Sequence, residues 1–186
     1  TLVTEMDGTM LPIVKTQSGA GLDGRKGKEL FWREARLCLA RPLEAVEALY
    51  GATFGTVQMA GWLWRQVAEA AGLGPQTRVH GLGDGADWIA ATFQEQFGTG
   101  RDSRATYTVD FHHVSDYLAA AAQVVAPQSN KDWLHQQQQC LRQSKVSEVL
   151  RTLESHQEPE QQKEAPVRTA RGYIHERRQY MDYARA

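Results

Sequence analysis

The chain has 186 residues, of which 41% are hydrophobic and 23% charged, and it contains five Trp, six Tyr and five Phe. This composition predicts one folded domain, or one domain with an appendage, and it excludes disorder along most of the chain. The formal net charge of -1 argues against a surface that is basic throughout, as in many proteins that bind nucleic acid.

The sequence also limits the compartment and the redox chemistry. No apolar run approaches the roughly 20 residues of a membrane-spanning helix, and the N-terminus lacks the basic and apolar regions of a signal peptide. Cys38 and Cys140 are far apart and form no CxxC pair, which argues against a disulfide framework and a zinc site. We therefore expect a cytoplasmic protein that has no membrane partner.

Three strands are predicted near the N-terminus. Thr1–Met6 and Leu11–Thr16 are short apolar runs on either side of Asp7-Gly8-Thr9, and Asp-Gly between such runs indicates a hairpin turn. Residues 17–28 are rich in glycine and predict a loop. Trp32–Ala40 alternates in the manner of a strand and is followed by Pro42.

The middle of the chain alternates helix and strand. Apolar residues at helical spacing, glycine turns and strand-like alternation mark five further elements. In chain order they are a helix over Thr56–Ala71, a strand over Thr77–Leu82, a helix over Ala86–Phe97, a strand over Ala105–Asp110 and a helix over Val114–Val125. The order of elements predicts an α/β fold with a mixed sheet and helices packed on it.

The remainder is predicted to be helical and polar. Asn130–Ser155 is rich in Gln, Glu158–Pro166 is a charged linker, and Val167–Ala186 is a last helix with five Arg against two acidic residues. The chain begins with Thr1, and no Gly or Pro stops the last helix after Tyr183. We therefore expect a fragment of a longer protein.

Two aspartates are the strongest candidates for catalysis. Asp7 and Asp84 each follow a predicted strand and precede a Gly, and functional groups gather at the carboxyl ends of strands in α/β sheets. If the two strands are neighbours and parallel, their carboxylates form a seat for Mg²⁺, and a pair of such ions supports phosphodiester cleavage. The alternative is structural, because Asp-Gly is a common hairpin turn and Asp84 can cap the following helix.

Further polar residues lie at the start of the helix after the Ala105–Asp110 strand and in basic segments. Asp110-Phe111-His112-His113 joins that strand to the helix, with Asp116 one turn later, and a His beside a carboxylate can orient a phosphate. The structural alternative is that the histidine is a half-buried polar group that makes one hydrogen bond. The basic residues that could contact phosphates are Arg25, Lys26, Lys28, Arg177 and Arg178. For the loop from Arg25 to Lys28, the alternative is a solvated loop that binds nothing.

Taken together, five segments resemble the catalytic region of prokaryotic insertion-sequence transposases of the DDE type, near the mutator-like group. The segments are Met6–Thr9, Trp32–Leu37, Gly83–Ile89, Val109–His113 and Tyr173–Tyr183. None of these motifs is specific alone. Their order and spacing carry the resemblance, which covers nearly the whole chain.

The resemblance implies an RNase H-like fold, with a mixed five-stranded sheet flanked by helices and a C-terminal helical insertion. It divides the chain into the first part of a catalytic core (1–126), a helical insertion with its charged linker (127–166) and the start of a last catalytic helical segment (167–186). Family members cleave DNA at the ends of a mobile element and transfer the free 3′ end to target DNA. Element ends and target DNA are the implied partners, together with further copies of the chain.

The resemblance assigns roles in metal binding to particular residues of this sequence. Three carboxylates bind two Mg²⁺ or Mn²⁺ ions in the family, and the first two match Asp7 and Asp84. The third, a Glu, has no match; we expect it beyond Ala186, and Glu176 lies in a different local context. His113 matches a recurrent histidine beside the active site. The resemblance thus implies a transposase core that is inactive as a fragment.

Two other functions remain open. Glu5–Thr9 with Gly83–Gly85 also resembles the first and last motifs of haloacid-dehalogenase-like phosphatases, in which Glu5 would take the place of the aspartyl nucleophile and Asp87 that of a late acidic residue. Glu is one methylene too long for a nucleophile held by a tight loop. A DNA-binding RNase H-like module without catalytic activity is the third function.

Overall fold

The computed structural model describes residues 1–16, 28–98, 104–159 and 163–185. The chain divides into two units, each with its own internal packing. The first unit comprises Thr1–Val79 and Ala91–Ala105, and the second comprises His80–Ala90 and Thr106–Ala186. Arg25 and Lys26, two of the expected phosphate contacts, lie outside the described residues.

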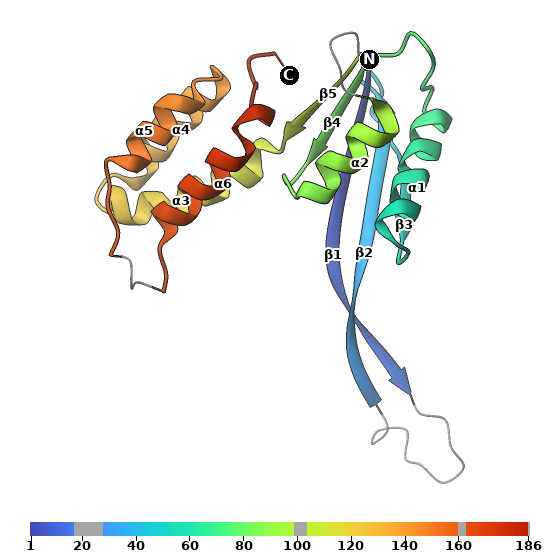
Figure 1. Cartoon of the computed structure of the whole chain (residues 1–186), viewed down its shortest axis with the longest axis horizontal. Coiled ribbons are helices and arrows are strands. Elements are labelled where there is room, and N and C mark those ends of the chain that lie inside the picture. Colours follow the sequence, from blue (N-terminus) through green and yellow to red (C-terminus); the bar gives the residue numbers. More distant parts are fainter. Residues whose placement is uncertain (17–27, 99–103, 160–162, 186) are drawn as a thin grey trace. The chain divides into compact units, whose positions relative to one another are not determined.

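Five strands form one mixed sheet that is flanked by helices, in the order β3-β2-β1-β4-β5 (Figure 1). The strands are β1 (Leu2–Thr16), β2 (Lys28–Pro42), β3 (Leu49–Thr53), β4 (Val79–Gly83) and β5 (Ala105–Val109). The predicted α/β class is confirmed, and from the first helix onward helices and strands alternate as predicted.

The predicted hairpin turn at Asp7-Gly8 is wrong. β1 runs without interruption from Leu2 to Thr16 and pairs antiparallel with β2 along its whole length, with Asp7 opposite Leu37. A local Asp-Gly signal is weak beside a ladder of fifteen paired residues that satisfies backbone groups on both strands. The third predicted strand therefore belongs to β2, and the actual third strand is β3.

Met10–Thr16 of β1 and Lys28–Glu34 of β2 form a two-stranded ribbon, which we call the arm (Figure 1). The pairing of β2 with β3 runs from Arg36 to Ala40 of β2. On one face of the arm, large apolar side chains are more than half exposed: Met10, Val14, Leu30 and Trp32. On the other face, the Lys15 ammonium lies 5.2 Å from the centre of the Phe31 ring.

The core of the first unit is built on Trp64 from α1 (Val57–Ala70), which packs against β2 and β3. The helix begins as predicted, because the Thr56 side chain accepts a hydrogen bond from the Met59 amide at 3.2 Å. Trp64 is fully buried, and its ring centre lies 5.7 Å from Phe93 and 5.3 Å from Phe97. Both Phe residues come from α2 (Asp87–Phe97).

The Cys38 thiol is buried in this unit, and burial raises its pKa to about 11, although a hydrogen bond from the Gly51 backbone opposes the shift. We expect an alkylating reagent at pH 8 to modify the half-buried Cys140 and to spare Cys38 until urea unfolds the chain, as read by peptide mass spectrometry. Equal labelling of both thiols in the folded protein would contradict this expectation.

The folded state holds the Cys38 proton more tightly than the unfolded state does. The stability that the protonated Cys38 thiol contributes is therefore lost as the pH rises from about 9 towards 11.

In the described part of the second unit, four helices and a short 3-10 turn follow β5. They are α3 (Phe111–Val125), α4 (Asn130–Arg142), α5 (Val146–Glu154), α6 (Pro166–Arg177) and η1 (Arg178–Tyr180). α3 packs against α4 and α6, and α5 packs against the same two helices. Their shared interior is apolar and includes Leu118, Leu141, Leu153 and Ile174, all fully buried. This packing supplies the burial that helices so rich in Gln need.

Two predicted helices are shorter in the structure. Asn130–Ser155 is divided into α4 and α5 at Ser144, which has a φ of 57° and whose hydroxyl bonds Asp182 Oδ1 at 2.7 Å. The last helix ends at Arg177 rather than continuing to Ala186. Tertiary contacts of the residues after Arg177, such as the fully buried Met181, replace the last helical turns. In the described ranges, no helix has the length and apolar character needed to cross a membrane.

Candidate functional site

Asp84 lies in a sharp turn directly after β4, at the carboxyl end of that strand. Its carboxylate Oδ1 accepts a hydrogen bond from the Ala86 amide at 2.8 Å, and Gly85 has a φ of +84°. The side chain thus fixes the turn before α2, which agrees with the structural role considered for it. Among the described residues, none donates a hydrogen bond to Oδ2, so one carboxylate oxygen of this half-buried residue is not used by the turn.

Two side chains of α6 donate hydrogen bonds to the backbone of the same turn. The Tyr173 hydroxyl donates a hydrogen bond to the Asp84 carbonyl oxygen, and Arg177 Nε donates one to the Gly85 carbonyl oxygen at 2.6 Å. The Arg177 guanidinium also lies 4.4 Å from the centre of the Tyr173 ring. We call these two hydrogen bonds the α6 clasp.

A cluster of rings supports the clasp. Tyr117 of α3 stacks on Tyr173 with ring centres 4.1 Å apart and planes at 16°. The His113 ring lies 5.6 Å from Tyr117 and 5.7 Å from Tyr173. His113, predicted to lie beside the active site, therefore contacts the residue that bonds the Asp84 backbone.

Burial holds Tyr107, Tyr173 and Tyr183 of this unit in the protonated form at neutral pH. Burial raises the pKa of Tyr173 above its ordinary value, and the Asp84 charge adds to the shift while Arg177 opposes it. Burial also raises the pKa of Tyr107, with a further contribution from Asp84. Burial raises the pKa of Tyr183 as well, and the nearby Tyr173 and Asp110 groups raise it further. The Tyr173 hydroxyl is consequently available as a hydrogen-bond donor.

Asp110 links the ends of β4 and β5 and starts α3. Its amide donates to the Gly83 carbonyl at 2.7 Å, and its carboxylate accepts a hydrogen bond from the His112 amide at 3.0 Å. Asp110 therefore serves as a helix cap. His112 and Asp116 are exposed.

Asp7 belongs to the first unit, and Asp84 to the second. Asp7 is exposed within β1, and its Oδ1 accepts a hydrogen bond from the neighbouring Gly8 amide at 2.7 Å. The turn role considered for Asp7 is excluded, because β1 does not turn there. Glu5, the nucleophile of the phosphatase hypothesis, also lies inside β1, opposite Leu39, rather than on a loop.

Carboxylate oxygens are the ligands that Mg²⁺ prefers, and the second oxygen of Asp84 and the exposed Asp7 side chain fit that chemistry. Within residues 1–16, 28–98, 104–159 and 163–185, no group of three or more His, Cys, Asp and Glu side chains is arranged to hold a metal ion. A pair of carboxylates is smaller than such a group, and Mg²⁺ commonly completes its coordination with water and phosphate oxygens.

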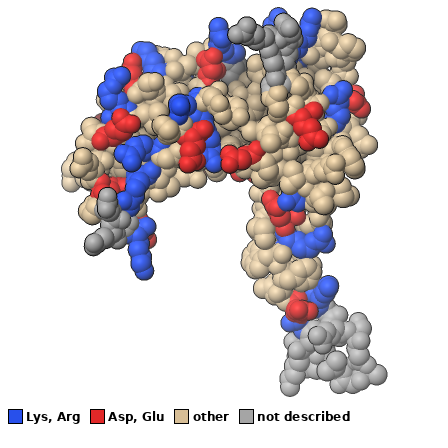
Figure 2. Space-filling view, viewed as in Figure 1, with Lys and Arg blue, Asp and Glu red and all other residues tan. Residues whose placement is uncertain are grey.

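The basic residues expected to contact phosphates differ in their surroundings. Lys28 is exposed at the start of β2, and Arg178 is exposed and donates to the His175 carbonyl at 2.7 Å. Arg177 is instead half-buried, bonded to Gly85 and paired with Glu176 at 2.9 Å. On the face in Figure 2, Lys and Arg side chains are interspersed with Asp and Glu.

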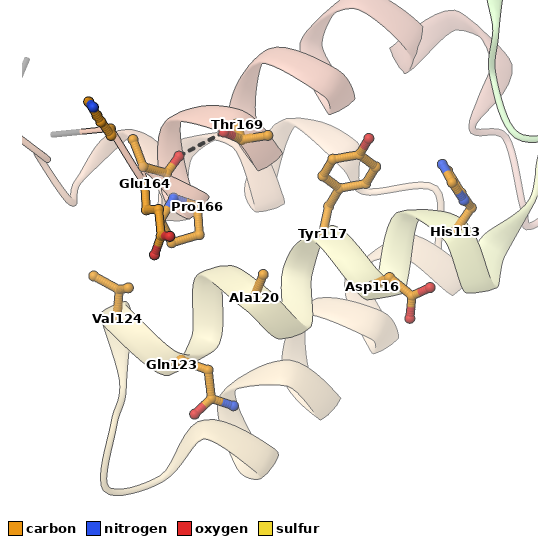
Figure 3. Close-up of a pocket in the computed structure, with 11 residues that line it drawn as sticks. His113, Asp116, Tyr117, Ala120, Gln123, Val124, Glu164, Pro166 and Thr169 are labelled. Carbon is orange, nitrogen blue, oxygen red and sulfur yellow. Dashed lines mark hydrogen bonds between the residues drawn. The ribbon is translucent and has the colours of Figure 1, made fainter. Parts of the chain in front are cut away.

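A groove of about 690 Å³ runs along α3 in the second unit (Figure 3). Figure 3 shows α3 side chains on one side and Glu164, Pro166 and Thr169 on the other. Its lining is mainly apolar, and it reaches His113 and Tyr117 of the ring cluster. The groove was not foreseen from the sequence, although its α3 residues recur at helical spacing.

The clasp was also missed. The segment Tyr173–Tyr183 was selected for its resemblance and Arg177 as a phosphate contact, whereas both α6 side chains bond a turn about ninety residues earlier. Their spacing of four residues, which places both on one helix face, was the available signal.

No protein-family model, curated protein or solved structure matches this chain.

Proposed function

We propose that this chain is the catalytic region of a DDE-type transposase, and that Asp7 and Asp84 are two of the carboxylates that bind its divalent cations. The proposal rests first on the placement of Asp84. It follows a sheet strand directly, one of its carboxylate oxygens is not used by the turn, and its backbone is held by a helix from the far end of the chain. Such a fixed acidic group at the end of a strand is typical of a catalytic site.

The sheet gives further support. β1 and β4, which carry Asp7 and lead to Asp84, are neighbours in the order β3-β2-β1-β4-β5. The first three strands are antiparallel, as expected for an RNase H-like core. In this proposal, the carboxylates hold Mg²⁺ or Mn²⁺, which when bound would polarise the scissile phosphate and activate the attacking oxygen. DNA is the substrate, and a second copy of the chain takes part in joining two element ends.

Iron-directed cleavage of the protein tests the shared metal site. Fe²⁺ replaces Mg²⁺ at carboxylate sites and, with ascorbate and peroxide, cuts the polypeptide beside the bound ion. We expect cuts next to both Asp7 and Asp84, suppressed by excess Mg²⁺, and both lost in Asp84→Asn. Asn keeps an oxygen that can accept the Ala86 hydrogen bond, so the turn is retained.

Asp87→Asn is the matched control, since Asp87 is exposed at the start of α2, three residues away. It should leave both cuts unchanged. Cuts at neither aspartate, or cuts that survive in Asp84→Asn, contradict the proposal. DNA binding that persists in Asp7→Asn and Asp84→Asn without any metal-dependent cut favours the module without catalytic activity.

A further inference from the structure

The backbone of the Asp84 turn is fixed at three consecutive points. The Ala86 amide bonds the Asp84 carboxylate, the Tyr173 hydroxyl bonds the Asp84 carbonyl, and Arg177 Nε bonds the Gly85 carbonyl. A carbonyl group and the side chain on the same residue share one Cα, so rotation of the turn moves both. The direction of the Asp84 carboxylate is therefore coupled to two α6 side chains.

The donor atoms of the clasp are themselves held in place. The Tyr173 ring stacks on Tyr117 at 4.1 Å and contacts the Arg177 guanidinium at 4.4 Å. Both Tyr173 and Arg177 are largely shielded from water, and the side chain of Arg177 is 17% exposed. A hydrogen bond between shielded, immobilised groups is stronger than one between mobile groups in water.

Gly85 makes this close approach possible. A Cβ at this position would lie 2.7 Å from Arg177 Cδ and 2.8 Å from the Tyr173 hydroxyl oxygen. Gly85 also has the positive φ that brings its carbonyl towards α6. Position 85 thus accommodates the clasp both in space and in backbone conformation.

We propose that Tyr173 and Arg177 are positioning residues that orient the Asp84 carboxylate for metal binding through the backbone of the turn. This inference rests on the proposed function, because it assumes that Asp84 binds a divalent cation. The two residues do not touch the metal. They act as the outer hydrogen-bonding partners that commonly tune a metal ligand, whose loss typically weakens metal binding 10- to 100-fold.

The test compares two hydroxyl deletions on stacked rings. Tyr173→Phe keeps the ring and removes only the donor to Asp84. Tyr117→Phe is the matched control, because its ring is half of the same stack and its hydroxyl bonds no residue among those described. Mn²⁺ binding is measured by electron paramagnetic resonance, well below the melting temperature of each variant.

We expect Tyr173→Phe to weaken Mn²⁺ binding about tenfold, Tyr117→Phe to leave it within about twofold, and Arg177→Met to weaken it like Tyr173→Phe. Arg177→Lys, which retains a cationic donor, should restore part of the affinity. Circular dichroism checks that each variant remains folded, and Arg177→Met provides a second measurement if Tyr173→Phe does not fold.

The outcomes separate the two proposals. If the unmodified chain binds Mn²⁺ and Asp84→Asn does not, the metal role of Asp84 stands. In that case, unchanged affinity in both Tyr173→Phe and Arg177→Met overturns the positioning role alone, as does an equal loss in Tyr117→Phe. If the unmodified chain binds no Mn²⁺, or Asp84→Asn binds it equally well, the proposed function fails.

Discussion

Replacing Trp64 with alanine is expected to lower the free energy of unfolding by about 3–5 kcal/mol. Trp64 is fully buried, and its ring packs against Phe93 and Phe97. The indole also donates a hydrogen bond to the buried hydroxyl of Thr4, which in turn donates to the Leu39 carbonyl at 2.6 Å. Alanine would leave a large cavity and remove the donor from a chain of hydrogen bonds that ties α1 to β1 and β2.

Urea unfolding measured by far-ultraviolet circular dichroism provides the value. Trp62→Ala is the control on the same helix, because Trp62 is 55% exposed, and we expect it to cost less than about 1 kcal/mol. Trp64→Phe retains a ring and should cost about 1–2 kcal/mol for the lost hydrogen bond and the smaller volume. Equal losses at Trp62 and Trp64 would show that Trp64 does not anchor this core.

Gly85→Ala is expected to destabilise the fold by about 2–5 kcal/mol. Positive φ costs a residue with a Cβ about 1–2 kcal/mol, and the overlap with Arg177 and Tyr173 adds about 1–3 kcal/mol. Two of the three nearest atoms belong to Arg177, whose side chain is already fixed by its hydrogen bond to Gly85. The overlap can be relieved only by breaking the clasp.

Gly72→Ala separates the two contributions. Gly72 also has a positive φ, of 99°, and a Cβ there would meet nothing within 4 Å. It should therefore cost only about 1–2 kcal/mol for backbone strain. Thermal unfolding of both variants gives the comparison, and a Gly85→Ala variant no less stable than Gly72→Ala would mean that the clasp yields easily.

The parts of the fold that the sequence predicts are those set by local chemistry. α1 was predicted correctly because its apolar residues recur at helical spacing and a glycine-rich segment follows it. The Asp7-Gly8 turn was wrong because a turn signal acts over a few residues, whereas the pairing of β1 with β2 is decided along the whole strand. β3 was missed because five residues interrupted by Gly51 show no clear alternation.

The candidate site shows the same limit. Asp84 could be selected because its strand, glycine and helix are neighbours in the sequence. The clasp could not, since Tyr173 and Arg177 meet the turn only after α3 to α6 have packed. His113 was selected by resemblance, and its contact with Tyr173 depends on the packing of α3 against α6.

The long pairing of β1 with β2 bears on how the sheet assembles. Its pairs range from Thr16 with Lys28, which are close in the sequence, to Leu2 with Pro42, which are far apart. Each pair that forms brings the next within reach, so no single step closes a long loop at full entropic cost. Pairing that begins between residues close in the sequence favours fast formation of β1. β4 is the other neighbour of β1 in the sheet. The arm is thus the outer end of a hairpin that can zip from its most local pairs towards the centre of the sheet.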